Sequence, residues 1–315
     1  MRRRVALAAL LGLALAAAGC GVAGKGAAGF GSDGERLRVA TTTNFITDSV
    51  AEVGGSRVEV VGLMGPGVDP HLYRASAGDV ETLAQADVIF YGGLLLEAKL
   101  QEVLEEVGRE RLAIPVTRDI PERLLLPPPG GSPGGEEHDP HVWFDVSLWM
   151  RAVETIRDGL IEADPEGEAA YRRNAERYLR RLRRLDRFAA RQLARIPQRR
   201  RVLVTSHDAF RYLGRAYGVE VAAIQGISTA DEATTADIER VARLIAERGV
   251  RAVFVESSVP PQTIDAVLAA ARRRGAPVRR GGELYSDAAG EPGTPAGTYV
   301  GMVEANVRRL VEGLL

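Results

Sequence analysis

Residues 164–197 read DPEGEAAYRRNAERYLRRLRRLDRFAARQLARIP, and this stretch decides how the chain is organised. Its apolar side chains recur in steps of three or four residues, at Tyr171, Ala175, Tyr178, Leu182, Leu185, Ala189, Leu193 and Ile196. This spacing predicts one amphipathic helix over 164–196, with Asp164 as its N-cap and Pro197 as its end. A helix of that length extends for about 47 Å.

Strands and helices alternate on both sides of this segment, as in parallel βα units. Apolar runs predict strands at 37–40, 57–63, 88–91 and 112–116, and then at 201–205, 219–224, 250–255 and 278. Helical spacing predicts helices at 76–86, 94–107 and 144–162, and then at 209–217, 235–248, 263–274 and 300–315.

We therefore expect an α/β protein with two doubly wound parallel-sheet lobes, at 37–163 and 197–315. One long spine helix at 164–196 would join the lobes. The alternative for this helix is a coiled-coil arm that pairs two chains. A second α/β pattern begins directly after the helix, and this favours a spine within one chain.

The composition is that of a folded soluble protein, with 315 residues of which 45% are hydrophobic and 26% are charged. Forty-one Lys and Arg nearly balance 42 Asp and Glu, so there is no electrostatic case for binding nucleic acid. The single cysteine excludes an intrachain disulfide and a cysteine-based zinc site. The sequence contains no glycine-rich phosphate-binding motif, so it does not indicate a nucleotide cofactor.

The first twenty residues have the pattern of an export signal. Three arginines precede an apolar run that is too short to span a bilayer, and the run ends at Ala17-Ala18-Gly19-Cys20. Small residues before a cysteine resemble the bacterial lipobox, so we predict a signal peptide at 1–19 and lipidation of Cys20. An ordinary cleaved signal is the alternative. The glycine-rich segment 20–36 is expected to form a lipid-anchored flexible tether that reaches about 20 Å.

Three of the four histidines lie where open α/β sheets bind ligands, which is beyond the carboxyl ends of strands. His71 follows the 57–63 strand, His141 follows a Pro/Gly-rich loop, and His207 comes directly after the 201–205 strand. The tripeptide Asp-Pro-His occurs twice, at 69–71 and 139–141. Neutral imidazole is the commonest transition-metal ligand, which favours a metal site. Three unrelated loop histidines with local hydrogen bonds are the other interpretation, and spacing leaves both open.

Six segments carry a resemblance to a known family; they are Gly67–Tyr73 (GVDPHLY), Ala86–Phe90 (ADVIF), Asp139–Asp145 (DPHVWFD), Thr205–Tyr212 (TSHDAFRY), Phe254–Ser258 (FVESS) and Leu284–Asp287 (LYSD). In this order and spacing they resemble the metal-receptor lipoproteins of zinc and manganese ABC importers, the cluster A-I substrate-binding proteins. The resemblance covers the chain from about Leu37 to Leu315. It implies two α/β lobes bridged by a long helix, with a metal site in the cleft between the lobes.

Carried over residue by residue, the resemblance implies that His71, His141, His207 and Asp287 are the metal ligands. Three imidazoles and one carboxylate suit tetrahedral Zn²⁺, and they suit Mn²⁺ if the carboxylate is bidentate. We expect Glu256 to support a ligand histidine or to pack between the lobes, with docking to the transporter as its other interpretation.

Two departures from the family pattern leave the metal open. Many zinc-specific members carry a His- and Asp-rich loop before the second ligand, whereas residues 127–140 are rich in Pro and Gly here. Manganese-type members often have Glu where this chain has His207. We expect His138 to be an exposed loop residue, with an accessory metal contact as the alternative.

The resemblance implies an extracytoplasmic receptor that captures Zn²⁺ or Mn²⁺ and delivers it to an ABC importer permease. Such a protein would be anchored to the cell membrane through Cys20, would be a monomer, and would be neither an enzyme nor a nucleic-acid binder. A secreted zinc-dependent hydrolase with the same ligands is one alternative, although no motif supplies its general base. A surface adhesin is the other alternative.

Overall fold

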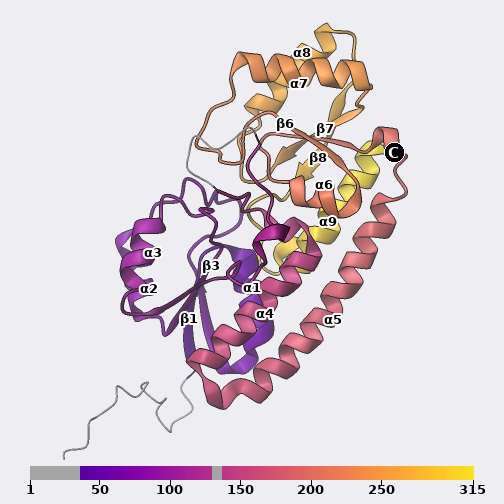
Figure 1. Cartoon of the computed structure of the whole chain (residues 1–315). Coiled ribbons are helices and arrows are strands. Elements are labelled where there is room, and N and C mark those ends of the chain that lie inside the picture. The colour runs from indigo at the N-terminus through magenta and orange to yellow at the C-terminus, as the bar shows by residue number, and fades with distance from the viewer. Residues whose placement is uncertain (1–35, 130–136) are drawn as a thin grey trace, which may run out of the picture. The chain divides into compact units, whose positions relative to one another are not determined.

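The computed structural model describes residues 36–129 and 137–315. The predicted signal peptide, Cys20 and the predicted tether up to residue 35 lie outside the described residues. Within them, parallel strands alternate with helices, and one helix is much longer than the rest (Figure 1). The predicted α/β class with parallel sheets and a long helix is therefore confirmed. No described helix is both long enough and apolar enough to cross a membrane.

The first lobe is built on a four-stranded parallel sheet with the strand order β2-β1-β3-β4. The strands are β1 (Leu37–Thr41), β2 (Val58–Gly62), β3 (Val88–Tyr91) and β4 (Leu112–Pro115). The helices are α1 (Asn44–Gly54), α2 (Ala77–Gln85), α3 (Gln101–Val107) and α4 (Val146–Ala163). Helices α1 and α4 pack on one face of the sheet, and α2 and α3 pack on the other, which is the doubly wound arrangement.

The second lobe holds two parallel strand pairs, β5–β6 and β7–β8, with β5 in contact with β7. The strands are β5 (Val202–Thr205), β6 (Glu220–Ala223), β7 (Ala252–Glu256) and β8 (Arg279–Leu284). The helices are α6 (Arg211–Tyr217), α7 (Thr235–Arg248), α8 (Gln262–Arg273) and α9 (Tyr299–Leu314). Helices α7 and α8 pack on one face of the strands, and α6 and α9 pack on the other.

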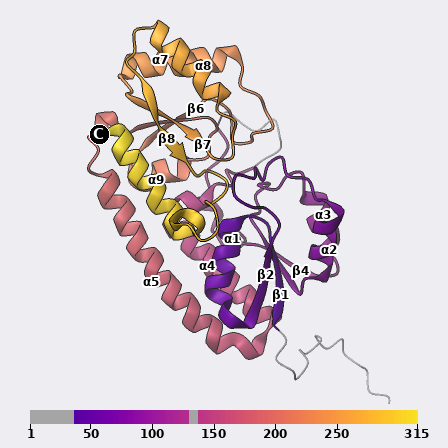
Figure 2. The ribbon, with the colours of Figure 1, turned by 180° about the vertical axis from the view of Figure 1, so that it is seen from behind.

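The long helix α5 (Glu168–Leu193) buries the apolar stripe that the sequence spacing predicts. The three residues Pro165–Gly167 before it form a 3₁₀ turn, because the Asp164 side chain accepts a hydrogen bond from Gly167 N. Helix α9 runs beside α5 along the second lobe and reaches α1 of the first (Figure 2). Other 3₁₀ turns occur at Gly55–Arg57, Glu122–Leu124, Val142–Phe144, Gln198–Arg200 and Pro295–Gly297.

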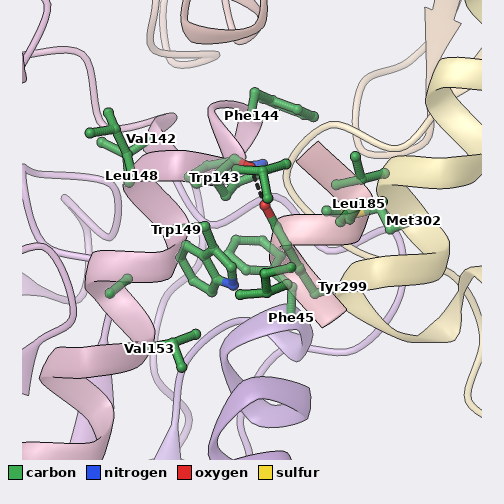
Figure 3. Packing of buried hydrophobic residues seen from close by; sticks show 14 of the residues in the cluster. Phe45, Val142, Trp143, Phe144, Leu148, Trp149, Val153, Leu185, Tyr299 and Met302 are labelled. Atoms are coloured by element: carbon green, nitrogen blue, oxygen red, sulfur yellow. Dashed lines mark hydrogen bonds between the residues drawn. The ribbon is translucent and has the colours of Figure 1, made fainter. Parts of the chain in front are cut away.

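One hydrophobic core continues from the first sheet through α4, α5 and α9 to β7. At its centre, the rings of Trp149 and Tyr299 stack with their centroids 5.1 Å apart, and Phe45 packs against Trp149 (Figure 3). The Tyr299 hydroxyl donates a 2.7 Å hydrogen bond to the carbonyl oxygen of Trp143. Because these aromatic side chains come from α1, α4 and α9, the two lobes share their packing.

The helix predicted at 94–107 is wrong over its first half, since α3 begins at Gln101. Leu94 and Leu95 adopt left-handed backbone conformations with φ of 55° and 61°, which a helix excludes. The turn forms around Glu97, whose buried carboxylate accepts hydrogen bonds from Gly92 N and from the Thr42 hydroxyl, both at 2.7 Å. The strand predicted at Val278 begins one residue later, at Arg279.

Leu185→Ala tests the contribution of the α5 stripe to stability. Leu185 is 2% exposed within the shared core. Truncating it should lower the free energy of unfolding by about 2–5 kcal/mol, because apolar burial is lost and a cavity remains. Arg183→Ala on the exposed face of the same helix is the control and should change it by less than about 0.5 kcal/mol. Equal losses in urea unfolding would contradict the assignment of the buried face.

Candidate metal centre

Four side chains from distant parts of the chain converge between the lobes. His71 lies in the loop after β2, and His141 lies just before α4. His207 and Asp287 follow β5 and β8 in the second lobe. One possible ligand atom from each residue lies within 4.8 Å of all the others. His71 is 2% exposed and the other three side chains are fully buried.

The spacing of the donor atoms is that of ligands around a single ion. His141 Nε2 lies 3.4 Å from His71 Nε2 and 3.3 Å from His207 Nε2. Asp287 Oδ1 lies 3.4 Å from His207 Nε2 and 3.6 Å from His141 Nε2. Donors about 2.0–2.1 Å from a tetrahedral zinc ion are about 3.3–3.4 Å apart. The described residues thus hold a preformed three-nitrogen, one-oxygen donor set.

The two Asp-Pro-His tripeptides use their aspartates in the same local way. Asp69 Oδ1 accepts a 2.9 Å hydrogen bond from His71 N, and Asp139 Oδ1 accepts a 3.0 Å bond from His141 N. Asp139 Oδ1 also lies 2.8 Å from His141 Nδ1, which turns Nε2 of that ring toward the cluster. In both tripeptides the aspartate therefore fixes the backbone of the histidine two residues later, and in the second it also orients the imidazole.

The second oxygen of each aspartate faces the other lobe. Thr229 donates a 2.6 Å hydrogen bond to Asp69 Oδ2, and the Arg211 guanidinium lies 3.5 Å from Asp139 Oδ2. The loops that carry His71 and His141 are thereby connected to the second lobe. Neither Thr229 nor the interlobe role of Asp69 and Asp139 was predicted, because the sequence does not show which loops meet.

Glu256 lies behind His207 at the end of β7. Its Oε1 accepts hydrogen bonds from Ser206 N at 2.7 Å and from His207 N at 2.9 Å. Its Oε2 lies 2.5 Å from His207 Nδ1, an ion-pair contact between two fully buried side chains. This carboxylate therefore fixes both the backbone and the ring of His207.

Ser258 holds the carboxylate of Asp287 from the side opposite the histidines. Its hydroxyl donates a 2.9 Å hydrogen bond to Asp287 Oδ2 and lies 2.6 Å from the Ser286 hydroxyl. Asp287 Oδ1 is left to face the imidazoles. Ser258 ends the FVESS segment, but nothing in the sequence pattern alone indicated this contact.

The charges within the cluster are unevenly distributed. Burial lowers the pKa of His71 to about 3, so this imidazole is neutral. Burial also opposes a charge on His207, but the carboxylates of Glu256 and Asp287 outweigh it and raise the pKa of His207 well above its usual value. Burial alone would raise the pKa of Asp287, yet His207 holds it below its ordinary range. Within the cluster, a protonated His207 therefore faces the ionised carboxylate of Asp287.

His138 does not belong to this cluster. The expectation that it is exposed was wrong, because its side chain is half-buried next to Asp139.

Comparisons with known proteins show the family to which the chain belongs. The family model described as "ZnuA: Zinc-uptake complex component A periplasmic" matches residues 39–313, which include both lobes and all four clustered side chains. The chain belongs to the ZnuA family. This match confirms the resemblance to the metal receptors of ABC importers that the sequence motifs indicated.

Two curated relatives of this ZnuA-family chain illustrate how similar it is to its neighbours. The manganese-binding lipoprotein MntA of Bacillus subtilis (strain 168) is 42% identical over 314 residues, which cover 99% of each chain. The zinc-binding protein TroA of Treponema pallidum (strain Nichols) is 45% identical over 285 residues, which cover 90% of each. The solved structure of periplasmic TroA matches with a TM-score of 0.85 at 44% identity, over 89% of this chain and 99% of that chain.

Glu256→Gln tests the support of His207. The substitution keeps the shape of the side chain but removes the negative charge beside Nδ1, so the imidazole becomes a poorer and less oriented donor. We expect the affinity for Zn²⁺ to fall by about 10–100-fold, as measured by competition with a chelator. Glu283→Gln, at an exposed position of β8, is the matched control and should leave the affinity unchanged. Equal affinities of the two variants would show that Glu256 does not act on the site.

Proposed function

We propose that this chain is the extracytoplasmic receptor of an ABC importer, which captures Zn²⁺ or Mn²⁺ between its lobes and delivers it to a permease. The observation that carries the proposal is the buried cluster of His71, His141, His207 and Asp287 in a chain of the ZnuA family. These four side chains would bind the ion directly, and Glu256 would hold His207 in place.

The donor set is compatible with either ion. Imidazole nitrogen suits Zn²⁺, and affinity alone favours Zn²⁺ over Mn²⁺. Mn²⁺ prefers more oxygen donors, which a bidentate Asp287 would supply in part. Two relatives of nearly equal similarity are named for different metals, manganese for MntA and zinc for TroA. Metal availability and coordination geometry therefore decide which ion is carried.

The burial of the cluster favours a receptor over a hydrolase. A catalytic zinc site keeps one coordination position open to water and substrate and has a general base nearby. Here the four residues of the cluster are 0–2% exposed, an arrangement that encloses a small ion but admits no extended substrate. Hydrolysis that is lost in Glu256→Gln would support the hydrolase, and binding of a host ligand by metal-free protein would support the adhesin.

The proposal includes lipid anchoring at Cys20 and a monomeric receptor that works with a permease. Support for the anchor comes from the match with MntA, which is named a lipoprotein and aligns over 99% of this chain. The part of the chain that would be tethered begins its first strand at Leu37.

His207→Glu tests the metal ligands and the basis of selectivity together. The change replaces a nitrogen donor by oxygen and leaves two imidazoles and two carboxylates, which suits Mn²⁺ better than Zn²⁺. We expect the ratio of zinc to manganese affinity to fall at least about tenfold, equivalent to about 1.4 kcal/mol. Competitive titration of Zn²⁺ against Mn²⁺ measures this ratio.

His207→Ala is the companion variant and should weaken the binding of both ions, because it only removes a ligand. If His207→Glu binds metal with an unchanged ratio, His207 is not a ligand and the proposed site is wrong. Loss of binding in both variants, with normal binding in the unmodified chain, would support the ligand role but not the account of selectivity.

Metal affinity should fall as the pH falls. Because its raised pKa keeps His207 protonated at neutral pH, an incoming ion must displace that proton. Displacing one proton lowers the affinity about tenfold for each unit of pH below the pKa of His207. His71 contributes nothing to this dependence between pH 5 and 8, since its pKa is about 3. Zn²⁺ titrations at several pH values check this, and a flat affinity would contradict it.

A further inference from the structure

We infer that the exposed face of α5 is a docking surface for a lipid bilayer that carries anionic headgroups. The inference adds a partner surface to the proposed function and rests on it in one respect, the lipid anchor at Cys20. It does not depend on which ion the metal centre binds.

The charge of the chain is concentrated on this one helix. Helix α5 holds nine arginines and only three acidic residues, Glu168, Glu176 and Asp186. The remainder of the chain holds 32 basic and 39 acidic residues. The net charge of the chain is therefore close to zero because a strongly basic helix offsets an acidic remainder.

The arginines of α5 form a continuous row on the side away from the core. The row comprises six exposed side chains that recur every three or four residues: Arg173, Arg177, Arg180, Arg184, Arg187 and Arg191. Among the described residues, only Arg180 of this row pairs with a carboxylate, that of Glu176 at 2.6 Å. The other five cations are available to an external anion.

The shape of the helix favours an extended anionic surface as its partner. The row from Arg173 to Arg191 extends for about 27 Å along the helix. The aromatic side chains of α5 cannot stack on exposed bases, because Tyr171 and Tyr178 are buried and Phe188 is half-buried beneath Arg308. Sequence-tolerant binding of single-stranded nucleic acid relies on such stacking. Arginine side chains can bind the phosphate groups of lipid headgroups without any aromatic stacking, so an anionic bilayer fits this surface better.

The point where the chain enters the fold is close to the beginning of α5. Leu37 pairs with Val58 in the first sheet. The neighbouring Arg57 binds Asp164, the residue that caps the turn before α5, through a 2.8 Å hydrogen bond from Nε. Fifteen residues lie between Cys20 and Arg36, and the sixteen Cα–Cα steps from one to the other cannot span more than about 55 Å. A lipid on Cys20 therefore confines the basic helix to the neighbourhood of the bilayer.

Proximity and charge act together in this arrangement. Attraction between arginine and an anionic leaflet acts within roughly 10 Å of the surface at physiological salt, and it increases with each cation. A lipid anchor keeps α5 at a high effective concentration near the bilayer. Even a weak attraction between the arginines and the headgroups is then enough to orient the tethered protein. With α5 against the headgroups, the back of both lobes would face the bilayer.

The test measures binding of the mature chain carrying Cys20→Ser, so that the lipid does not mask the helix. The probes are vesicles of phosphatidylcholine and vesicles of phosphatidylcholine mixed with phosphatidylglycerol. We expect binding only to the anionic vesicles, with a steep loss as salt is raised. Combining Arg177→Gln, Arg184→Gln and Arg191→Gln should weaken this binding at least about tenfold.

A second triple variant controls for net charge. Arg111→Gln, Arg243→Gln and Arg251→Gln remove three exposed arginines outside α5 and should change vesicle binding less than about twofold. Both triple variants should keep the melting temperature and the Zn²⁺ affinity of the parent chain. Equal weakening by the two triples, or no binding of the parent to anionic vesicles, would overturn the inference. Tighter binding to a DNA duplex than to the vesicles would also overturn the inference, because the partner would then be nucleic acid rather than a bilayer.

Failure of the proposed function gives a different result. If no form of the protein binds Zn²⁺ or Mn²⁺, the receptor proposal is wrong while the vesicle measurements still decide the role of α5. If the chain with an intact Cys20 is released from cell membranes by salt alone, the lipid anchor is wrong. The confinement of α5 to the bilayer is then overturned with it.

Discussion

Trp143 connects the two lobes at the candidate metal centre. Its indole Nε1 donates a 3.0 Å hydrogen bond to the carbonyl oxygen of Ser286, directly before Asp287. Its own carbonyl oxygen accepts from Tyr299 in the shared core, and its ring lies 5.1 Å from that of His141. This buried side chain therefore connects the segment that carries His141 in the first lobe with the segment that carries Asp287 in the second. The contact helps to keep the donor atoms of the proposed ligands close together.

The surroundings of the cluster explain how buried charge is tolerated there. An isolated charge in a protein interior is costly, and each charged group here has a partner. Glu256 accepts two backbone N–H groups, Asp287 accepts from Ser258, and His207 lies between these two carboxylates. In the proposed function, an entering divalent ion would replace the proton of His207, so the site would exchange one buried cation for another. The polar surroundings are therefore already arranged for positive charge.

Much of this could be predicted from local patterns, because strands, helix stripes and strand-end histidines follow from short-range spacing. The Asp-Pro-His repeat placed two candidate ligands, and His207 followed from its position after β5. Asp287 was implied only by the family resemblance, since an aspartate in a loop has many possible roles. The turn around Glu97 could not be predicted, because its buried carboxylate acts on backbone groups that sequence spacing does not bring together. The pairing of α9 with α5 depends on long-range packing for the same reason.

The shared core also limits how an ion can reach the centre. Moving the lobes apart as rigid bodies would expose the aromatic packing between α1, α4 and α9, and each large apolar side chain removed from that packing costs about 1.5–3 kcal/mol. The contacts that close over the ligands are weaker, since a hydrogen bond such as that of Thr229 with Asp69 contributes only about 0.5–1.5 kcal/mol net. Opening at the loops around His71 and Asp287 is therefore less costly than separating the lobes. The packing of α5 against α9 would then keep the two halves of the proposed site in register while the loops opened for an ion.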